Sequence, residues 1–188
     1  MELSSVTPAP EALRALSHPL RLRILGALRA EGPATASGLA DRLGESSGTT
    51  SYHLRQLARH GFVVDDETRG HGRERWWRAA HQSTRTGDDL EDSAAGREAA
   101  DAFGQAVAVV HTEALQRAAE QRSVLTPEWR SASTLSDWTL RLTPARAREL
   151  TAALAAVVEG WTEADREDRG DVADFLVQVH AFPRPGAR

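Results

Sequence analysis

Two short helical patterns separated by only three residues constrain the fold of this chain more than any other feature. The first has apolar residues at helical spacing over 36–43 and ends at Gly44, a residue suited to a helix C-terminus. The second follows a serine cap at Ser46 or Ser47 and places Leu54 and Leu57 on its inner side. A break this short is typical of a helix-turn-helix, whose second helix enters the major groove of DNA.

The flanking sequence completes a larger pattern. Two helical segments come first, a short one with Leu13 and Leu16 and one that starts at Pro19 and stops at Gly32-Pro33. After Gly61 the periodicity changes, and 62–64 and 73–78 are predicted to be strands joined by a glycine-rich tip at 68–72. Three helices followed by a two-stranded ribbon is the element order of a winged helix, which we expect to span residues 8–81.

The second helix of the pair has the side chains that DNA recognition requires. Small polar residues in its first turns suit phosphates and base edges, and the later residues reach further. The candidates on this helix are Ser47, Thr49, Thr50, Ser51, Tyr52, His53, Arg55, Gln56 and Arg59, and those on the ribbon are Arg69, His71, Arg73 and Arg75.

Some of these residues also fit other roles. Tyr52 suits a base contact and a core position equally well, and His53 suits either a DNA contact or a brace for the turn. The arginines are compatible with ordinary solvated charges, although their grouping on one helix and one hairpin favours phosphate contacts.

The same region resembles the ArsR-type winged-helix repressors of bacteria. The resemblance rests on the stretch 16–25 (LSHPLRLRIL), on 51–57 (SYHLRQL) and on the arginine-rich ribbon after Gly61, all within residues 12–80. It implies that Ser51 to Leu54 lie on the recognition helix and that 69–75 form the wing, which touches flanking backbone or minor groove. It also implies a homodimer that reads an inverted-repeat operator, usually as a repressor.

The chain departs from that family where many of its members bind metals. Thr35 and Ser37 stand where such relatives have a Cys-x-Cys pair, and the long helix has Asp101 and His111 without a second histidine in register. We therefore expect no metal site and no cofactor.

The second half of the chain differs in character. Residues 82–93 are polar and acidic and are predicted to be a linker, and 94–122 are predicted to be one long helix. An apolar stripe on so long a helix needs a partner, so a homodimer interface is expected there. Its residues are Phe103, Val107, Val110 and Ala114.

Residues 137–142 alternate polar and apolar side chains, which predicts a strand before a helix that begins at Thr143-Pro144, and 172–182 are predicted to be a second strand closed by Pro183. The long helix and this small α/β unit would form a C-terminal domain over 94–188. Its aromatic residues fit two interpretations, a pocket for an apolar small-molecule inducer with Arg141 or His180 as polar handle, or a core that widens the dimer. These aromatic residues are Trp129, Trp138, Trp161, Phe175 and Phe182.

The element patterns together predict a mainly α fold with small β elements, and the composition excludes several classes of function. The chain has no cysteine, so disulfides and thiolate metal sites are excluded. The net charge of -4 divides into +2 over 1–82 and -6 over 83–188. No phosphate loop, nucleophile elbow or HExxH motif is present, so we expect no enzyme. Without an apolar span or leader we expect a cytoplasmic protein that partners with double-stranded DNA and itself, not with a membrane; the alternative is a winged-helix protein-interaction module.

Overall fold

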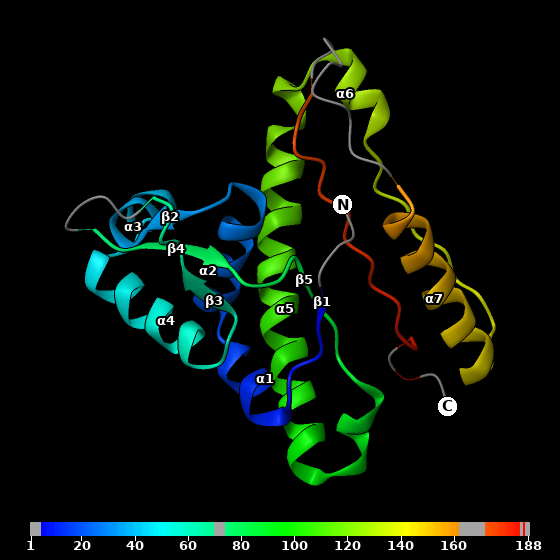
Figure 1. Ribbon diagram of the computed structural model, residues 1–188. Helices are drawn as coiled ribbons and strands as arrows, with labels where there is room; N and C mark the ends of the chain where they lie inside the picture. Colours follow the sequence, from blue (N-terminus) through cyan, green and yellow to red (C-terminus); the bar gives the residue numbers. More distant parts are fainter. Residues whose placement is uncertain (1–4, 70–73, 162–171, 185, 187–188) are drawn as a thin grey trace. The chain divides into compact units, whose positions relative to one another are not determined.

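The computed structural model describes residues 5–69, 74–161, 172–184 and 186, and the chain divides into two compact units, Met1–Glu120 and Gln121–Arg188 (Figure 1). The first unit contains the predicted winged helix and also the long helix. The division therefore falls later than the linker predicted at 82–93, which instead contains strand β5 (Ser83–Thr84) and the 3-10 helix η1 (Asp88–Asp92).

The helices of the first unit follow the predicted order. They are α1 (Pro10–Leu16), α2 (Pro19–Ala30), α3 (Ala36–Leu43), α4 (Ser47–Arg59) and α5 (Ala94–Gln121). The predicted caps are confirmed: Thr35 Oγ1 accepts the backbone N–H of Gly38, and Ser46 Oγ accepts that of Thr49. Gly44 has a φ of 68°, a left-handed conformation that favours glycine and ends α3 sharply before α4.

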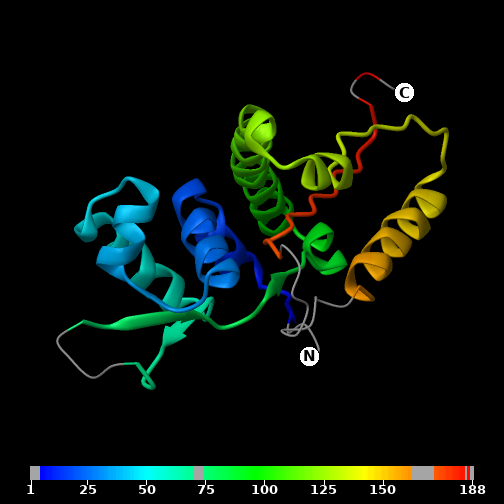
Figure 2. The same ribbon diagram turned by 90° about the horizontal axis from the view of Figure 1, so that it is seen from above.

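The predicted ribbon is present and has an extra strand. β3 (Val63–Asp65) and β4 (Trp76–Ala79) pair antiparallel, and β4 also pairs with β2 (Ala34–Thr35), which the sequence patterns did not predict. In Figure 2 the β3–β4 hairpin runs along one side of the helices α2 to α4. A separate parallel pair joins β1 (Ser5–Val6) to β5.

One hydrophobic core holds the helices to this sheet. Residues from α2, α3, α4 and both hairpin strands contribute to it, and Phe62 at the end of the turn after α4 is its largest fully buried side chain. Adjacent residues of a strand point to opposite faces of the sheet. Accordingly, Trp77 is buried in the core and its neighbour Trp76 is half-buried. The fully or nearly buried members are Leu16, Leu20, Ile24, Leu25, Leu28, Ala34, Leu39, Leu54, Leu57, Phe62, Val63 and Trp77.

The long helix α5 begins as part of the first unit. Ala99 forms a small buried cluster with Leu13 of α1 and Leu90 of η1, and Phe103 packs against both this cluster and the main core. Phe103, one of the residues predicted for a dimer interface, is half-buried and has packing partners within its own chain, and the predicted interface stays a prediction. Val107, Val110 and Ala114 are half-buried, and Val109 and Leu115 are exposed.

The start of α5 approaches η1 so closely that only glycine fits. A Cβ built on Gly96 would lie 2.1 Å from the carbonyl oxygen of Leu90, a backbone atom that cannot move aside cheaply. We expect Gly96→Ala to lower the free energy of unfolding by about 1–3 kcal/mol, the usual range for overpacking. Gly104→Ala on the same helix is the matched control, because nothing lies within 4 Å of its Cβ position. Urea denaturation followed by circular dichroism measures both, and equal effects would contradict the close approach.

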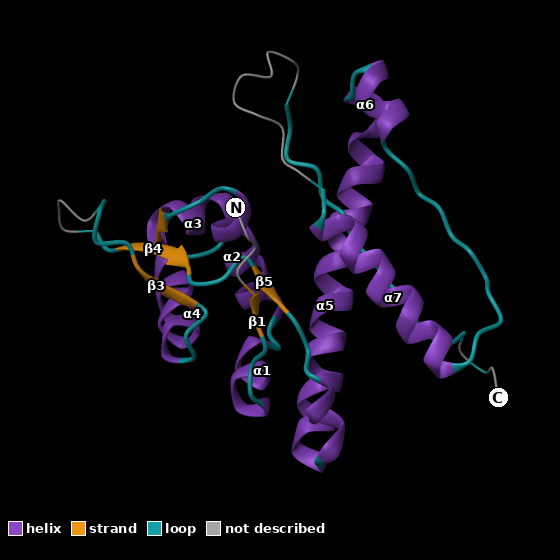
Figure 3. Ribbon diagram, turned by 45° about the vertical axis from the view of Figure 1, so that its right-hand side comes forward, coloured by secondary structure: helices purple, strands orange, loops and turns teal. Residues whose placement is uncertain are grey.

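The second unit differs from the predicted α/β arrangement. It contains η2 (Arg122–Val124), α6 (Pro127–Ala132) and α7 (Pro144–Glu159), the last capped by Thr143 as predicted. The strands predicted at 137–142 and 172–182 are not formed; Figure 3 draws the stretch between α6 and α7 as a loop. A strand exists only when its backbone pairs with another, and these two segments have no ladder partner within the described residues.

The apolar side chains of the second unit are exposed. Trp138 and Trp161 have 81% and 82% of their surface in solvent, and Phe182 has 73%. Trp129 and Phe175 stack with ring centroids 6.3 Å apart, although more than half of Phe175 is exposed. Most of these aromatic side chains are therefore exposed to solvent, and they do not form a buried core among the described residues.

Candidate nucleic-acid interface

Helix α4 divides cleanly into a buried face and an exposed face. Thr50, His53, Leu54 and Leu57 are buried, at the i, i+3, i+4 and i+7 spacing of one helix face. The opposite face carries polar and basic side chains, and the thirteen residues of the helix include no Asp or Glu. Its exposed or half-buried residues are Ser47, Thr49, Ser51, Tyr52, Arg55, Gln56 and Arg59.

Two of the predicted DNA-binding residues are instead packed inside the domain. Thr50 is fully buried, and its hydroxyl donates a hydrogen bond to the backbone carbonyl of Ser46, 2.9 Å away. His53 is only 8% exposed and stacks at a tilt on His18, at the start of α2. Because neither side chain reaches the outer face of α4, both brace the turn instead of facing solvent.

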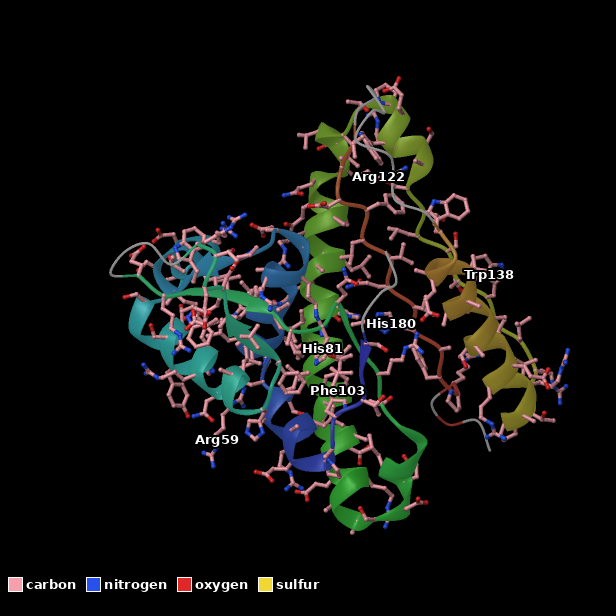
Figure 4. The ribbon with its side chains drawn as sticks, viewed as in Figure 1. Arg59, His81, Phe103, Arg122, Trp138 and His180 are labelled. Carbon is pink, nitrogen blue, oxygen red and sulfur yellow. The ribbon has the colours of Figure 1, made fainter. Side chains whose placement is uncertain are left out.

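The exposed face presents one aromatic and two long cations. Tyr52 has 53% of its surface exposed, which places it on the outer face and not in the core. Arg55 and Arg59 follow at one-turn intervals, and Figure 4 shows Arg59 at the far end of α4, pointing away from the domain. At the other end the first turn is exposed, with Ser46 accepting one of its backbone N–H groups. A helix N-terminus with a positive end dipole suits a phosphate.

The hairpin brings further arginines beside this helix. Arg75 lies over the Trp77 ring at 4.1 Å and donates to the Asp65 carboxylate at 2.6 Å, and Arg69 lies over the Trp76 ring at 5.6 Å. These contacts restrict both guanidinium groups, so less conformational entropy is lost when they bind an anion. His71 and Arg73 lie outside the described residues.

The turn that leaves β3 is fixed by one carboxylate. Asp66 accepts hydrogen bonds from the hydroxyl and the backbone N–H of Thr68. The Thr68 hydroxyl is the main reason that the pKa of Asp66 lies below its ordinary value. The base of the wing is therefore an ordered turn that keeps its charge at neutral pH.

A hollow of about 240 Å³ lies where three elements meet. Ser37 lines it from the first turn of α3, Ser51 and Arg55 line it from α4, and Glu74 and Arg75 line it from the hairpin. The Ser37 and Ser51 hydroxyls and two guanidinium groups around one hollow are the kinds of group that bind a backbone phosphate, although Glu74 lines the hollow too and Arg75 is ion-paired with Asp65. Sequence reasoning missed Ser37, although a small polar residue in the first turn of a capped helix could have indicated it.

One arginine of the domain has a structural role instead. Arg29 of α2 donates to the backbone carbonyl of His81 and to the hydroxyl of Thr84. Burial lowers the pKa of this guanidinium to about 10. Arg29 therefore ties α2 to the segment that leads toward α5, and it does not belong to the interface.

The described residues contain no cluster of three or more His, Cys, Asp or Glu side chains arranged to hold a metal ion. None of the described helices is both long enough and apolar enough to span a membrane.

Two helices joined by a tight turn and followed by a β-hairpin define a helix-turn-helix domain of the winged type, a class in which the second helix reads DNA. Comparison with known families agrees, since a family model described as a helix-turn-helix domain matches residues 16–66. No curated protein matches the chain. The matched stretch contains α2, α3, α4 and β3, so the chain carries the domain of a DNA-binding regulator.

Proposed function

We propose that this protein is a sequence-specific transcriptional regulator that binds an inverted-repeat operator as a homodimer, and that it acts as a repressor without catalytic activity. The observation that carries the proposal is the outer face of α4, which combines Ser51 and Tyr52 with Arg55 and Arg59 and has no acidic residue. The resemblance to ArsR-type repressors supports the repressor role.

Selection of binding sites from a random DNA pool tests the proposal. The full chain is incubated with the pool in excess heparin, which removes binding that depends on charge alone. We expect the recovered sequences to contain an inverted repeat whose half-sites are about one helical turn apart. Recovery of unrelated sequences, or complete competition by heparin, would favour the protein-interaction module instead.

The dimer is proposed because two half-sites require two recognition helices related by a two-fold axis. Val109 and Leu115 leave apolar surface exposed on α5, and the second unit exposes much more on Trp138 and Trp161. A second copy of the chain would cover such surface. Light scattering of the full chain measures the mass, and a monomer that still binds a palindrome tightly would contradict the dimer.

The proposal includes no inducer. The aromatics considered as a ligand pocket are mostly exposed to solvent, with Phe175 at 56% and Trp161 at 82%. This exposure favours the interpretation that a second chain covers these aromatics over that of a pocket for a small molecule.

A further inference from the structure

Two histidines meet at the joint between α2 and the recognition helix. The rings of His18 and His53 have their centroids 4.6 Å apart with a 43° angle between their planes. His18 is the N-cap residue of α2, and His53 lies on the buried face of α4. Neither ring belongs to the exposed DNA-facing surface described above.

The hydrogen bonding of His18 requires an unprotonated nitrogen. Its Nδ1 accepts the backbone N–H of Leu20 at 3.2 Å and so caps the first turn of α2. A proton on Nδ1 would remove this acceptor, and it would add positive charge to a helix N-terminus, whose dipole already disfavours cations. The cap therefore exists only while His18 is neutral at Nδ1.

The environment of His53 also disfavours a second proton. Its Nδ1 is fully buried and has no hydrogen-bond partner among the described residues. An imidazolium carries a proton on both nitrogens, so protonation would leave a charged N–H buried without an acceptor. The positive charge would also lie against the ring of His18.

The charged groups around the pair act mostly in the same direction. Arg21 on α2 faces both rings and Arg23 faces His18, while Glu45, from the turn between α3 and α4, opposes them. Arg23 and Glu45 are themselves ion-paired at 3.5 Å. Burial is the main cause that lowers the pKa of both rings from the ordinary 6.5. Arg21 and Arg23 lower the pKa of His18 further, and His18 and then Arg21 lower that of His53.

We propose that the His18–His53 pair is a proton-sensitive joint that holds the recognition helix on α2, so that acidification releases the protein from DNA. This regulation rests on the function proposed above. His53 also contacts Tyr52 edge-to-face, with ring centroids 5.2 Å apart, so the joint directly supports an exposed residue of the DNA-facing surface. His18 and His53 are positioning residues, since they act on DNA through α4 and Tyr52.

The direction of the effect follows from proton linkage. The joint is closed when the two rings pack together and open when they separate. Below pH 6.5, the ordinary pKa of histidine, the open joint binds protons that the closed joint does not, so acid favours opening. The closed joint is therefore fully stable above that pH and loses stability as the pH falls below it. Each linked proton can lower DNA affinity by up to about tenfold per pH unit in that range.

The experiment measures affinity for a selected DNA site from about pH 7.5 down to about pH 5.5. It compares the natural chain with the double variant His18→Asn/His53→Gln, because asparagine can cap α2 and glutamine is polar but does not titrate. His60→Gln is the matched control, since His60 ends α4 at the opposite end from the turn. We expect the natural chain and the control to lose affinity steeply with acid and the double variant to lose at least tenfold less. Equal losses in all three proteins would overturn the proposal.

A second measurement does not depend on the variants folding. An NMR titration of the histidine rings in the unaltered chain should show both His18 and His53 protonating below 6.5, together with a shift of the Leu20 amide signal. Titration of both rings at or above 6.5 with an unmoved Leu20 amide would overturn the joint. Failure to bind any DNA at about pH 7.5 would instead contradict the proposed function, whatever the rings do.

Discussion

Replacing Arg55 and Arg59 together with alanine is expected to weaken DNA binding by about 30-fold at near-physiological salt and to lower the salt dependence of binding. Both side chains are exposed on the face of α4 that carries no acidic residue. Each phosphate contact releases close to one counterion, so the slope of log affinity against log salt should fall by about 2. Fluorescence anisotropy with a labelled site over a salt series measures both quantities.

The control removes the same charge from elsewhere in the first unit. Arg14 of α1 and Arg117 of α5 are exposed and lie outside the matched domain, and Arg14 forms only an exposed ion pair with Glu98. The variant Arg14→Ala/Arg117→Ala should leave the salt slope unchanged, because an exposed pair contributes little to stability. If both double variants lower the slope equally, the effect comes from net charge and α4 is not the contact surface.

Much of the DNA-facing domain could be predicted from sequence because its signals are local. A threonine or serine before a helix, a glycine after it and apolar residues at helical spacing each act within a few positions. The sequence alone therefore predicts the roles of Thr35 and Gly44 correctly and places the cap of α4 at Ser46 or Ser47, of which Ser46 is the cap. The change from helical to alternating periodicity after Gly61 locates the hairpin in the same way.

The errors on α4 have a different cause. Thr50 was predicted to contact DNA because it is polar, and His53 was predicted either to contact DNA or to brace the turn. Both residues complete the buried stripe that Leu54 and Leu57 define, which agrees with the bracing role of His53 and not with DNA contacts. Their spacing with Leu54 and Leu57 indicated a buried face, but their polar side chains favoured an exposed position. His53 is buried with His18 packed against its ring. Because His18 lies 35 positions earlier in the chain, a local sequence pattern could not predict this contact.

The strands predicted in the second unit failed for a related reason. Alternation of polar and apolar residues shows that a segment suits a strand, but pairing requires a second segment in register. Residues 137–142 have the alternation, and neither they nor 172–182 form a ladder within the described residues. The two-residue strand β2 is the opposite case. It is too short to show any alternation, and it is a strand because it pairs with β4.

Replacing Phe103 with aspartate is expected to have the largest effect on stability of any single change considered. Phe103 packs on both buried clusters of the first unit, so the variant loses apolar contacts and places a carboxylate against them. We expect a loss of about 2–4 kcal/mol, a large part of the total for a domain of ordinary stability. Urea denaturation measures it, and Phe103→Leu, which stays apolar, should cost about 1 kcal/mol.

Val109→Asp on the same helix separates packing within the chain from association between chains. Val109 is exposed, with 46% of its surface in solvent, so its replacement should change the free energy of unfolding of one chain by less than about 0.5 kcal/mol. If α5 supplies the dimer interface, this variant should be a folded monomer by light scattering and should bind an inverted repeat weakly. A folded dimer would move the interface away from this face of α5, and the exposed aromatics of the second unit would become the surface to change next. An unfolded chain would show that Val109 has packing partners of its own, as Phe103 does.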